Sequence, residues 1–291
     1  MKWSIINILK SNMRSGFIVL GLASMMSSCL PDPLPVDGLP TLESKIVVSS
    51  QIIPDRGLVV LLTRSIGALD AGDDSDPEEL LQQIMINDAL VTLHYQNNID
   101  TLTSLGNGLY GGVTIEWTAG ITYELRAEAE GLQNISAFAQ LKESVPFENV
   151  NARLFINEYD SLAEVNYSLR DPEGENFYMV NVQQFSSTQE LTSLLNPNVF
   201  TYLKDDRDFE GQLFQDEFRV FFRDFMEGDT VAVFLSNVQK EYYEFWELRN
   251  ENRYGFSELA SEPLNYPTNV KGGLGFFTLQ ISDVRVFVLE E

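Results

Sequence analysis

The residue with the clearest chemical role is Cys29, the single cysteine of the 291-residue chain. Its thiol stands directly after residues 26–28, Met-Ser-Ser. Further upstream, residues 1–15 carry three cations and no acid, and residues 16–26 are apolar apart from Ser24. A charged segment followed by a short apolar segment is typical of a secretory signal peptide. The apolar segment is shorter than the ~20 residues that are needed to cross a bilayer core. This spacing predicts acylation of the Cys29 thiol and cleavage of the chain in front of it.

Residues 26–29 resemble the lipobox of bacterial lipoproteins, in the relaxed form seen in Bacteroidota. The resemblance implies a signal peptide over residues 1–28 and fatty-acyl chains such as palmitate on Cys29. Each buried CH₂ contributes about 0.8 kcal/mol, so several acyl chains would hold the protein on the membrane permanently. The alternative is a signal peptide that is cut elsewhere and leaves Cys29 as a free thiol.

Residues 29–42 contain four prolines and predict a stiff, extended spacer between the lipid and the folded body. Asp32 lies close behind Cys29 and resembles the export signal that sends some Bacteroidota lipoproteins to the cell surface. The expected location is therefore the outer membrane, on its periplasmic or its cell-surface face.

The charge of the chain limits its partners. The full chain carries a net charge of −24, and loss of residues 1–28 with Lys2, Lys10 and Arg14 would leave −27. Such a chain is unsuited to nucleic acid or to an anionic membrane surface. The simplest interpretation is that the acidity keeps the body soluble.

Catalytic parts are scarce in the sequence. The one histidine, His94, rules out a site with several histidine ligands and would have to serve any serine triad alone. No serine stands in a nucleophile-elbow pattern, and no two carboxylates are singled out by their spacing. We therefore expect no enzymatic activity, no catalytic residues, no cofactor and no metal.

The acidic stretch Asp70–Ile86 has two interpretations. Carboxylate oxygens favour calcium, but the spacing of Asp73, Asp74 and their neighbours does not fit an EF-hand loop. The other interpretation is a short helix, with Asp76 as its cap and Pro77 in its first position. We favour the helix.

The elements around these residues are predicted to be strands. Residues 45–52, 58–64 and 89–95 form short apolar or β-branched runs, and residues 121–130 alternate apolar and polar side chains with a period of two. Many short strands with glycine turns predict a mainly β protein, with a β-sandwich over residues 43–145.

Residues 146–291 are predicted to form a second β-rich domain with one or two helices. A Pro-Gly turn at 171–174 predicts that residues 163–183 form a hairpin, and residues 219–222 and 230–235 are predicted to pair. Capping boxes predict helices near 187–195 and over about 237–253. An aromatic stripe on the longer helix, which includes Tyr242, Phe245 and Trp246, is expected to cover the second sheet.

Residues 267–277 contain three glycines within four residues. A phosphate-binding loop would need a strand before it and a helix after it, whereas prolines precede this stretch and predicted strands follow. It is therefore predicted to be an ordered loop that leads into strands at 276–280 and 284–289.

Three short triplets, at 100–102, 160–162 and 229–231, have the pattern Asp-Ser/Thr-aliphatic. They resemble the O-glycosylation pattern of Bacteroidota envelope proteins, although such short triplets also arise by chance.

The body of the chain resembles a Bacteroidota lipoprotein family of unknown function, whose genes lie beside those of TonB-dependent receptors. The resemblance rests on the lipobox, the Pro-rich spacer, the strand Lys45–Val48, the segments 108–110 and 119–125, and above all the motif Asn269–Phe276. It implies an immunoglobulin- or transthyretin-like sandwich in the first half and transfers no catalytic residue.

Two functions follow as expectations. The first is an accessory binding module of a TonB-dependent receptor or uptake system. The second is a structural or assembly subunit of a larger envelope complex. A hydrolase of surface polymers is a third and weaker alternative.

Overall fold

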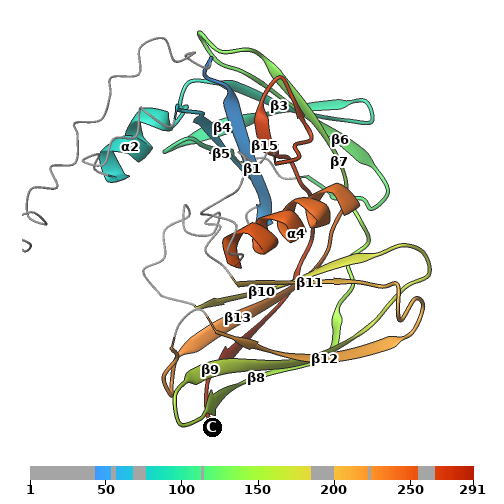
Figure 1. Cartoon of the computed structure of the whole chain (residues 1–291). Helices are drawn as coiled ribbons and strands as arrows, with labels where there is room; N and C mark the ends of the chain where they lie inside the picture. Colours follow the sequence, from blue (N-terminus) through green and yellow to red (C-terminus); the bar gives the residue numbers. More distant parts are fainter. Residues whose placement is uncertain are drawn as a thin grey trace, which may run out of the picture. The chain divides into compact units, whose positions relative to one another are not determined.

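Strands make up most of the structure (Figure 1), a computed structural model that describes residues 43–53, 57–67, 77–112, 115–184, 200–221, 224–254 and 266–291. The described residues contain sixteen strands and two helices, so the predicted mainly β fold is confirmed. The predicted signal peptide, Cys29, the spacer, Asp70–Asp76 and the helix predicted near 187–195 lie outside the described residues.

The first half forms one long sheet that folds over on itself. Its spatial order is β14-β7-β6-β3-β4-β5-β2-β1-β15. The strands are β1 (Ile46–Ile53), β2 (Gly57–Arg64), β3 (Leu90–Tyr95), β4 (Asn98–Gly106), β5 (Leu109–Gly111), β6 (Thr122–Glu128), β7 (Ile135–Gln140), β14 (Val270–Lys271) and β15 (Leu274–Phe276).

Strand β4 joins the two layers of this first sandwich. Its first residues pair with β3, its last residues pair with β5, and the register shifts between Ser104 and Gly106. Alternation along the strands sends Val48 and Leu62 from one layer, and Leu93 and Leu125 from the other, into a single buried core.

The glycine-rich segment 269–277 ties the two edges of this sheet together. It was predicted to be a loop, but it forms β14, which pairs with β7, and β15, which pairs in parallel with β1. The turn between them needs glycine, because a Cβ on Gly273 would lie 2.5 Å from the Ile46 carbonyl oxygen and 2.9 Å from Ile135 Cγ2. We call residues Asn269–Phe277 the glycine strap.

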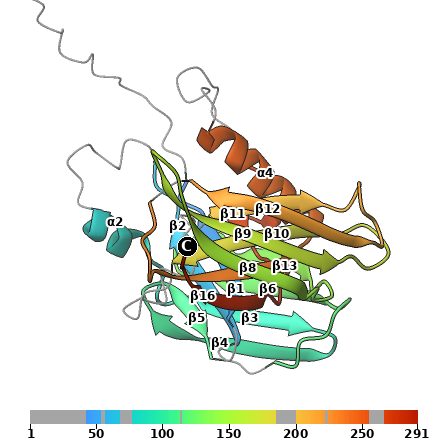
Figure 2. The same cartoon turned by 90° about the horizontal axis from the view of Figure 1, so that it is seen from below.

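The second half holds two smaller sheets that face each other. One has the order β11-β10-β13-β16 and the other β12-β9-β8 (Figure 2). The strands are β8 (Phe147–Ile156), β9 (Ser161–Arg170), β10 (Phe177–Gln184), β11 (Phe200–Asp205), β12 (Leu213–Val220), β13 (Thr230–Asn237) and β16 (Asp283–Val288). Their inward side chains, including Val165, Val180 and Val233, form a second core.

Both predicted hairpins in this half are wrong. Strand β9 pairs with β8 and β12, whereas β10 pairs with β11 and β13, so the turn at 171–174 carries the chain from one sheet to the other. Strands β12 and β13 likewise lie in different sheets. At the turn 171–174, the buried Asp171 carboxylate accepts hydrogen bonds from the Tyr178 hydroxyl and the Gly211 backbone N–H. These bonds fix the turn although the two strands beside it do not pair with each other.

Two helices complete the described chain. Helix α2 (Pro77–Ile84) begins at the proline, as predicted. Helix α4 (Lys240–Tyr254) begins three residues later than predicted, because Asn237 still belongs to β13. Tyr243 and Trp246 of α4 pack on Phe177 and Met179 of β10, so the helix covers the four-stranded sheet as expected. Within the described residues no helix is long and apolar enough to cross a membrane.

Candidate functional site

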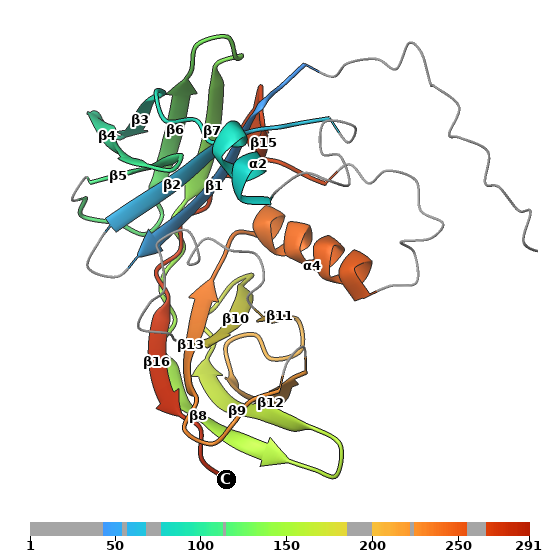
Figure 3. The ribbon, with the colours of Figure 1, turned by 90° about the vertical axis from the view of Figure 1, so that its left-hand side faces the viewer.

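A cavity of about 320 Å³ lies between β1, β10, β13, α4 and the glycine strap. Figure 3 shows α4 beside the strands of both sandwiches. We call this space the junction cavity. Its volume is at the lower end of the range for small-molecule sites, which often lie where two folded units meet.

Strand alternation supplies the first wall. In β1, the side chains of Val48, Ser50 and Ile52 are buried. The alternate residues Ser49 and Gln51 are half-buried and line the junction cavity. The same sequence period that builds the first core therefore places polar side chains on the outer face of β1.

The second wall follows the same rule. Strand β10 sends Tyr178, Val180 and Val182 into the second core. Its alternate residues Asn181 and Gln183 line the junction cavity. Asn181 lies opposite Thr201 of β11, and its Nδ2 donates to Thr201 Oγ1 over 2.8 Å, which orders both side chains at the wall.

Helix α4 supplies an aromatic wall. Tyr242, Phe245, Trp246 and Arg249 follow the spacing of one helix face and all line the junction cavity. Phe276 of the glycine strap meets this face, with its ring centroid 4.9 Å from that of Phe245 and 5.5 Å from that of Tyr242. Burial raises the pKa of Tyr242, so its hydroxyl stays protonated at neutral pH.

Trp246 contributes an unused hydrogen-bond donor. The residue is 8% exposed, and its Nε1–H has no hydrogen-bond partner. It lies near enough to the Tyr242 hydroxyl to oppose the rise in the pKa of that group, but without the geometry of a hydrogen bond. Buried donors are nearly always paired, so this indole is suited to an oxygen atom from a ligand.

Among the described residues, the lining of the junction cavity carries no carboxylate, although the chain has 43 acidic residues. Arg249 is the one charged member that the described part of the lining holds, and its guanidinium carbon lies 4.9 Å from the centre of the Trp246 ring. The remaining polar members are amides and hydroxyls. This wall is chemically distinct from the acidic surface of the protein.

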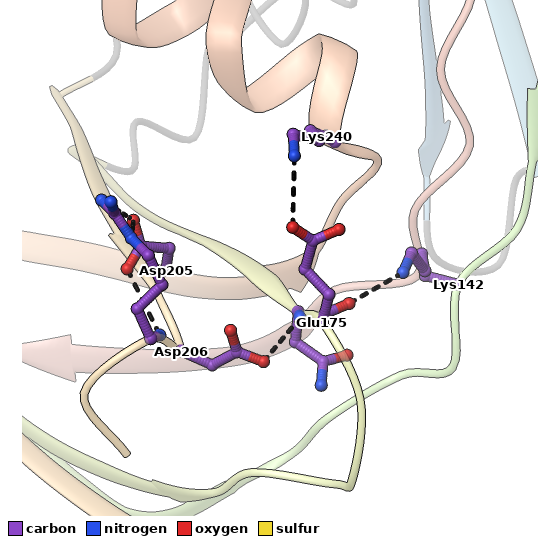
Figure 4. Close-up of polar contacts among 7 residues, drawn as sticks. Lys142, Glu175, Asp205, Asp206 and Lys240 are labelled. Atoms are coloured by element: carbon purple, nitrogen blue, oxygen red, sulfur yellow. Dashed lines mark hydrogen bonds and ion pairs between the residues drawn. The ribbon is translucent and has the colours of Figure 1, made fainter. Parts of the chain in front are cut away.

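Polar contacts fix the N-terminal end of α4 (Figure 4). Lys240 Nζ lies 3.2 Å from Glu175 Oε1, and Lys142 Nζ donates to the Glu175 backbone carbonyl over 3.2 Å. Beside them, Asn237 Nδ2 donates to Asn176 Oδ1 over 3.0 Å and lies 3.3 Å from the Glu143 carbonyl oxygen. These bonds tie the helix and the turn before β10 to the segment that leaves the first sandwich.

Of the residues that the structure describes, those that the sequence suggested for catalysis, metal binding or glycosylation do not line the junction cavity. His94 is on β3, where its Nε2 lies 3.0 Å from Thr92 Oγ1, and it does not line the junction cavity. Within the described ranges no three His, Cys, Asp or Glu side chains gather as a metal site. Of the three glycosylation-like triplets, Thr101 has an exposed side chain, whereas Ser161 Oγ donates to the Phe225 carbonyl over 2.6 Å.

Residues 32–283 match the family described as a domain of unknown function, DUF4249. The chain belongs to this family. The DUF4249 match covers the first sandwich, α4, the glycine strap and the second sandwich as far as the start of β16, so the expected membership of a family of unknown function is confirmed. No curated protein sequence matches the chain.

Two features of the sequence belong to the junction cavity. Ser49 and Gln51, like Asn181 and Gln183, are polar residues at alternate positions of largely apolar strands. The aromatic stripe of α4 was expected to be core. Trp246 is buried, whereas Tyr242 and Phe245 are partly buried. What no local pattern in this DUF4249 chain reveals is that β1 and β10 face one space.

Proposed function

We propose that this chain is a non-catalytic, lipid-anchored protein of the outer membrane that binds a small ligand and serves a TonB-dependent receptor as an accessory module. The observation that carries the binding role is the junction cavity, with its aromatic wall, its lining of amides and hydroxyls and the unpaired Trp246 N–H. Convergent polar groups in a largely apolar concavity are the usual marks of a binding site.

The composition of the cavity wall supports binding without catalysis. General acid–base chemistry needs a titratable group near the reacting atom. The residues of the wall that the structure describes include neither carboxylate nor histidine, and the Tyr242 hydroxyl, whose pKa is raised by burial, does not act as a base at neutral pH. Arg249 stays charged at any physiological pH and cannot act as a base.

The anchoring role rests on Cys29 and the spacer 29–42, and the link to a receptor rests on the resemblance described above. An extended proline-rich tether would let a folded body reach a neighbouring membrane protein while its lipid stays in the bilayer. The strongly acidic body would keep such a module soluble next to the membrane.

A detergent pull-down of the full-length protein from its native membrane, read by mass spectrometry, tests this function. We expect a TonB-dependent receptor to co-purify with the wild-type chain. Co-purification should fall strongly with Cys29→Ala, because the module would lose its local concentration at the membrane. Recovery of assembly or secretion machinery in place of a receptor, or no partner at all, would contradict the proposal.

A further inference from the structure

We infer that the junction cavity binds a small neutral molecule rich in hydroxyl groups, of the chemical class of saccharides. The inference rests on the proposed binding function and gives its ligand a chemistry. It is drawn from the side chains that line the cavity, the rings of α4 and the unpaired indole N–H.

The polar lining suits hydroxyl groups. Side-chain amides and hydroxyls can each both donate and accept a hydrogen bond, as can a hydroxyl of the ligand. Ser49 and Gln51 offer such groups from β1, and Asn181 and Gln183 offer them from β10. An ionised carboxylate would only accept and would favour a cation, and none occurs among the wall residues within the described ranges.

The aromatic wall suits the apolar face of a sugar ring. Tyr242, Phe245 and Trp246 present ring surface to the same space that the amides line. A cyclic polyol has C–H groups on its faces and hydroxyls at its edge, so one face can lie on these rings while its edge reaches the amides. This division of the cavity into apolar and polar sides would orient the ligand.

The Trp246 Nε1–H gives the ligand a specific anchor. Trp246 lines the cavity, and its Nε1–H is a buried donor without a hydrogen-bond partner. A hydroxyl or ring oxygen would pair with it, and a hydrocarbon ligand would leave it unpaired. A polyanion is disfavoured, because Arg249 is the one charged group in the described lining and the chain as a whole carries −24.

The test is a printed array of neutral oligosaccharides, with sulfated and uronic-acid glycans beside them, probed with the full-length chain in detergent. We expect the wild-type chain to retain neutral glycans. Trp246→Phe keeps a ring but removes the N–H, and retention should fall at least tenfold. Trp117→Phe is the matched control, because Trp117 packs on Tyr123 in the first core, and it should bind like the wild type.

A second variant and a second signal guard against misfolding of Trp246→Phe. Gln183→Ala changes a half-buried side chain and should also weaken retention at least tenfold. In the W3F/W117F chain, Trp246 is the sole tryptophan, and the glycan retained most strongly should shift its fluorescence with saturation. Circular dichroism checks that each variant is folded.

Three results would overturn the inference: no retention of neutral glycans, preference for the charged glycans, or equal retention by the folded Trp246→Phe and Gln183→Ala variants. A chain that fails on the array but still co-purifies with a receptor would refute the ligand class and leave the accessory role intact. Retention of neutral glycans without co-purification of a receptor would support the ligand class and refute the accessory role.

Discussion

Glu164 shows how this acidic chain handles a carboxylate inside a sheet. The residue is fully buried on β9, and its carboxylate lies between Arg153 of β8 and Arg219 of β12. Burial alone would raise the pKa of Glu164, but the hydrogen bonds from Arg219 and Arg153 bring it below its ordinary value of 4.5. Each guanidinium stays about half exposed, so water still solvates the positive side of the cluster.

Glu164→Gln should destabilise the protein by about 2 kcal/mol at pH 7, the scale of hydrogen bonds to charged groups. A lowered pKa in the folded chain means that ionised Glu164 stabilises the fold above pH 4.5 and that this contribution is lost as the pH falls through the folded pKa. Urea unfolding should therefore show a difference between wild type and variant that shrinks below pH 4.5.

The control for this change is Glu148→Gln. Glu148 lies 3.3 Å from Arg170 in an exposed ion pair, and its loss should cost no more than about 0.5 kcal/mol. Equal effects of the two substitutions, or a difference that grows in acid, would show that burial between two arginines has no special role.

The glycine strap forms strands although its three glycines predict a loop. Local sequence pattern does not show where a segment meets the edge of a sheet. Gly275 has a φ of +86° and pairs with Val48 of β1. Glycine is required here for two reasons, the positive φ and the close approach of the Val48 backbone. Asn269 closes the base of the strap: its Nδ2 donates to the Phe277 carbonyl, and its Oδ1 accepts from the Phe277 backbone N–H.

Gly275→Ala should lower the free energy of unfolding by about 3 kcal/mol or more. The new Cβ would lie 2.1 Å from the Val48 carbonyl oxygen, and the positive φ would be strained as well. Gly228→Ala is the matched control, because Gly228 has nearly the same φ, +88°, and no atom within 4 Å of its Cβ position. It should cost only about 1 kcal/mol. Chemical denaturation of both variants measures the difference, and equal losses would contradict the close approach.

The overall architecture could be predicted only in part. Strand positions and the start of α2 follow from period and capping, and both cores hold the apolar residues that alternation indicates. Partner choice between strands is not local: β9 and β10 flank a good turn and yet belong to different sheets. The buried bonds of Asp171 that redirect the chain reach Gly211, forty residues away.

The junction cavity shows the same limit. Each of its walls can be read from sequence, as polar residues at alternate strand positions and as an aromatic helix face. That they face one another depends on how the two sandwiches are joined. The contacts of Glu175 with Lys142 and Lys240 help to hold the two sandwiches together, and no short sequence motif predicts these contacts.

For the molecule as a whole, the function proposed above requires that Cys29 carry lipid. Cells that express the full chain should be fed an alkyne-bearing palmitate analogue, and the purified protein should be examined by intact mass and by fluorescent tagging. The account predicts a tagged protein that begins at Cys29 and loses its label with Cys29→Ala. An untagged chain with a titratable thiol, free in the medium, would contradict it.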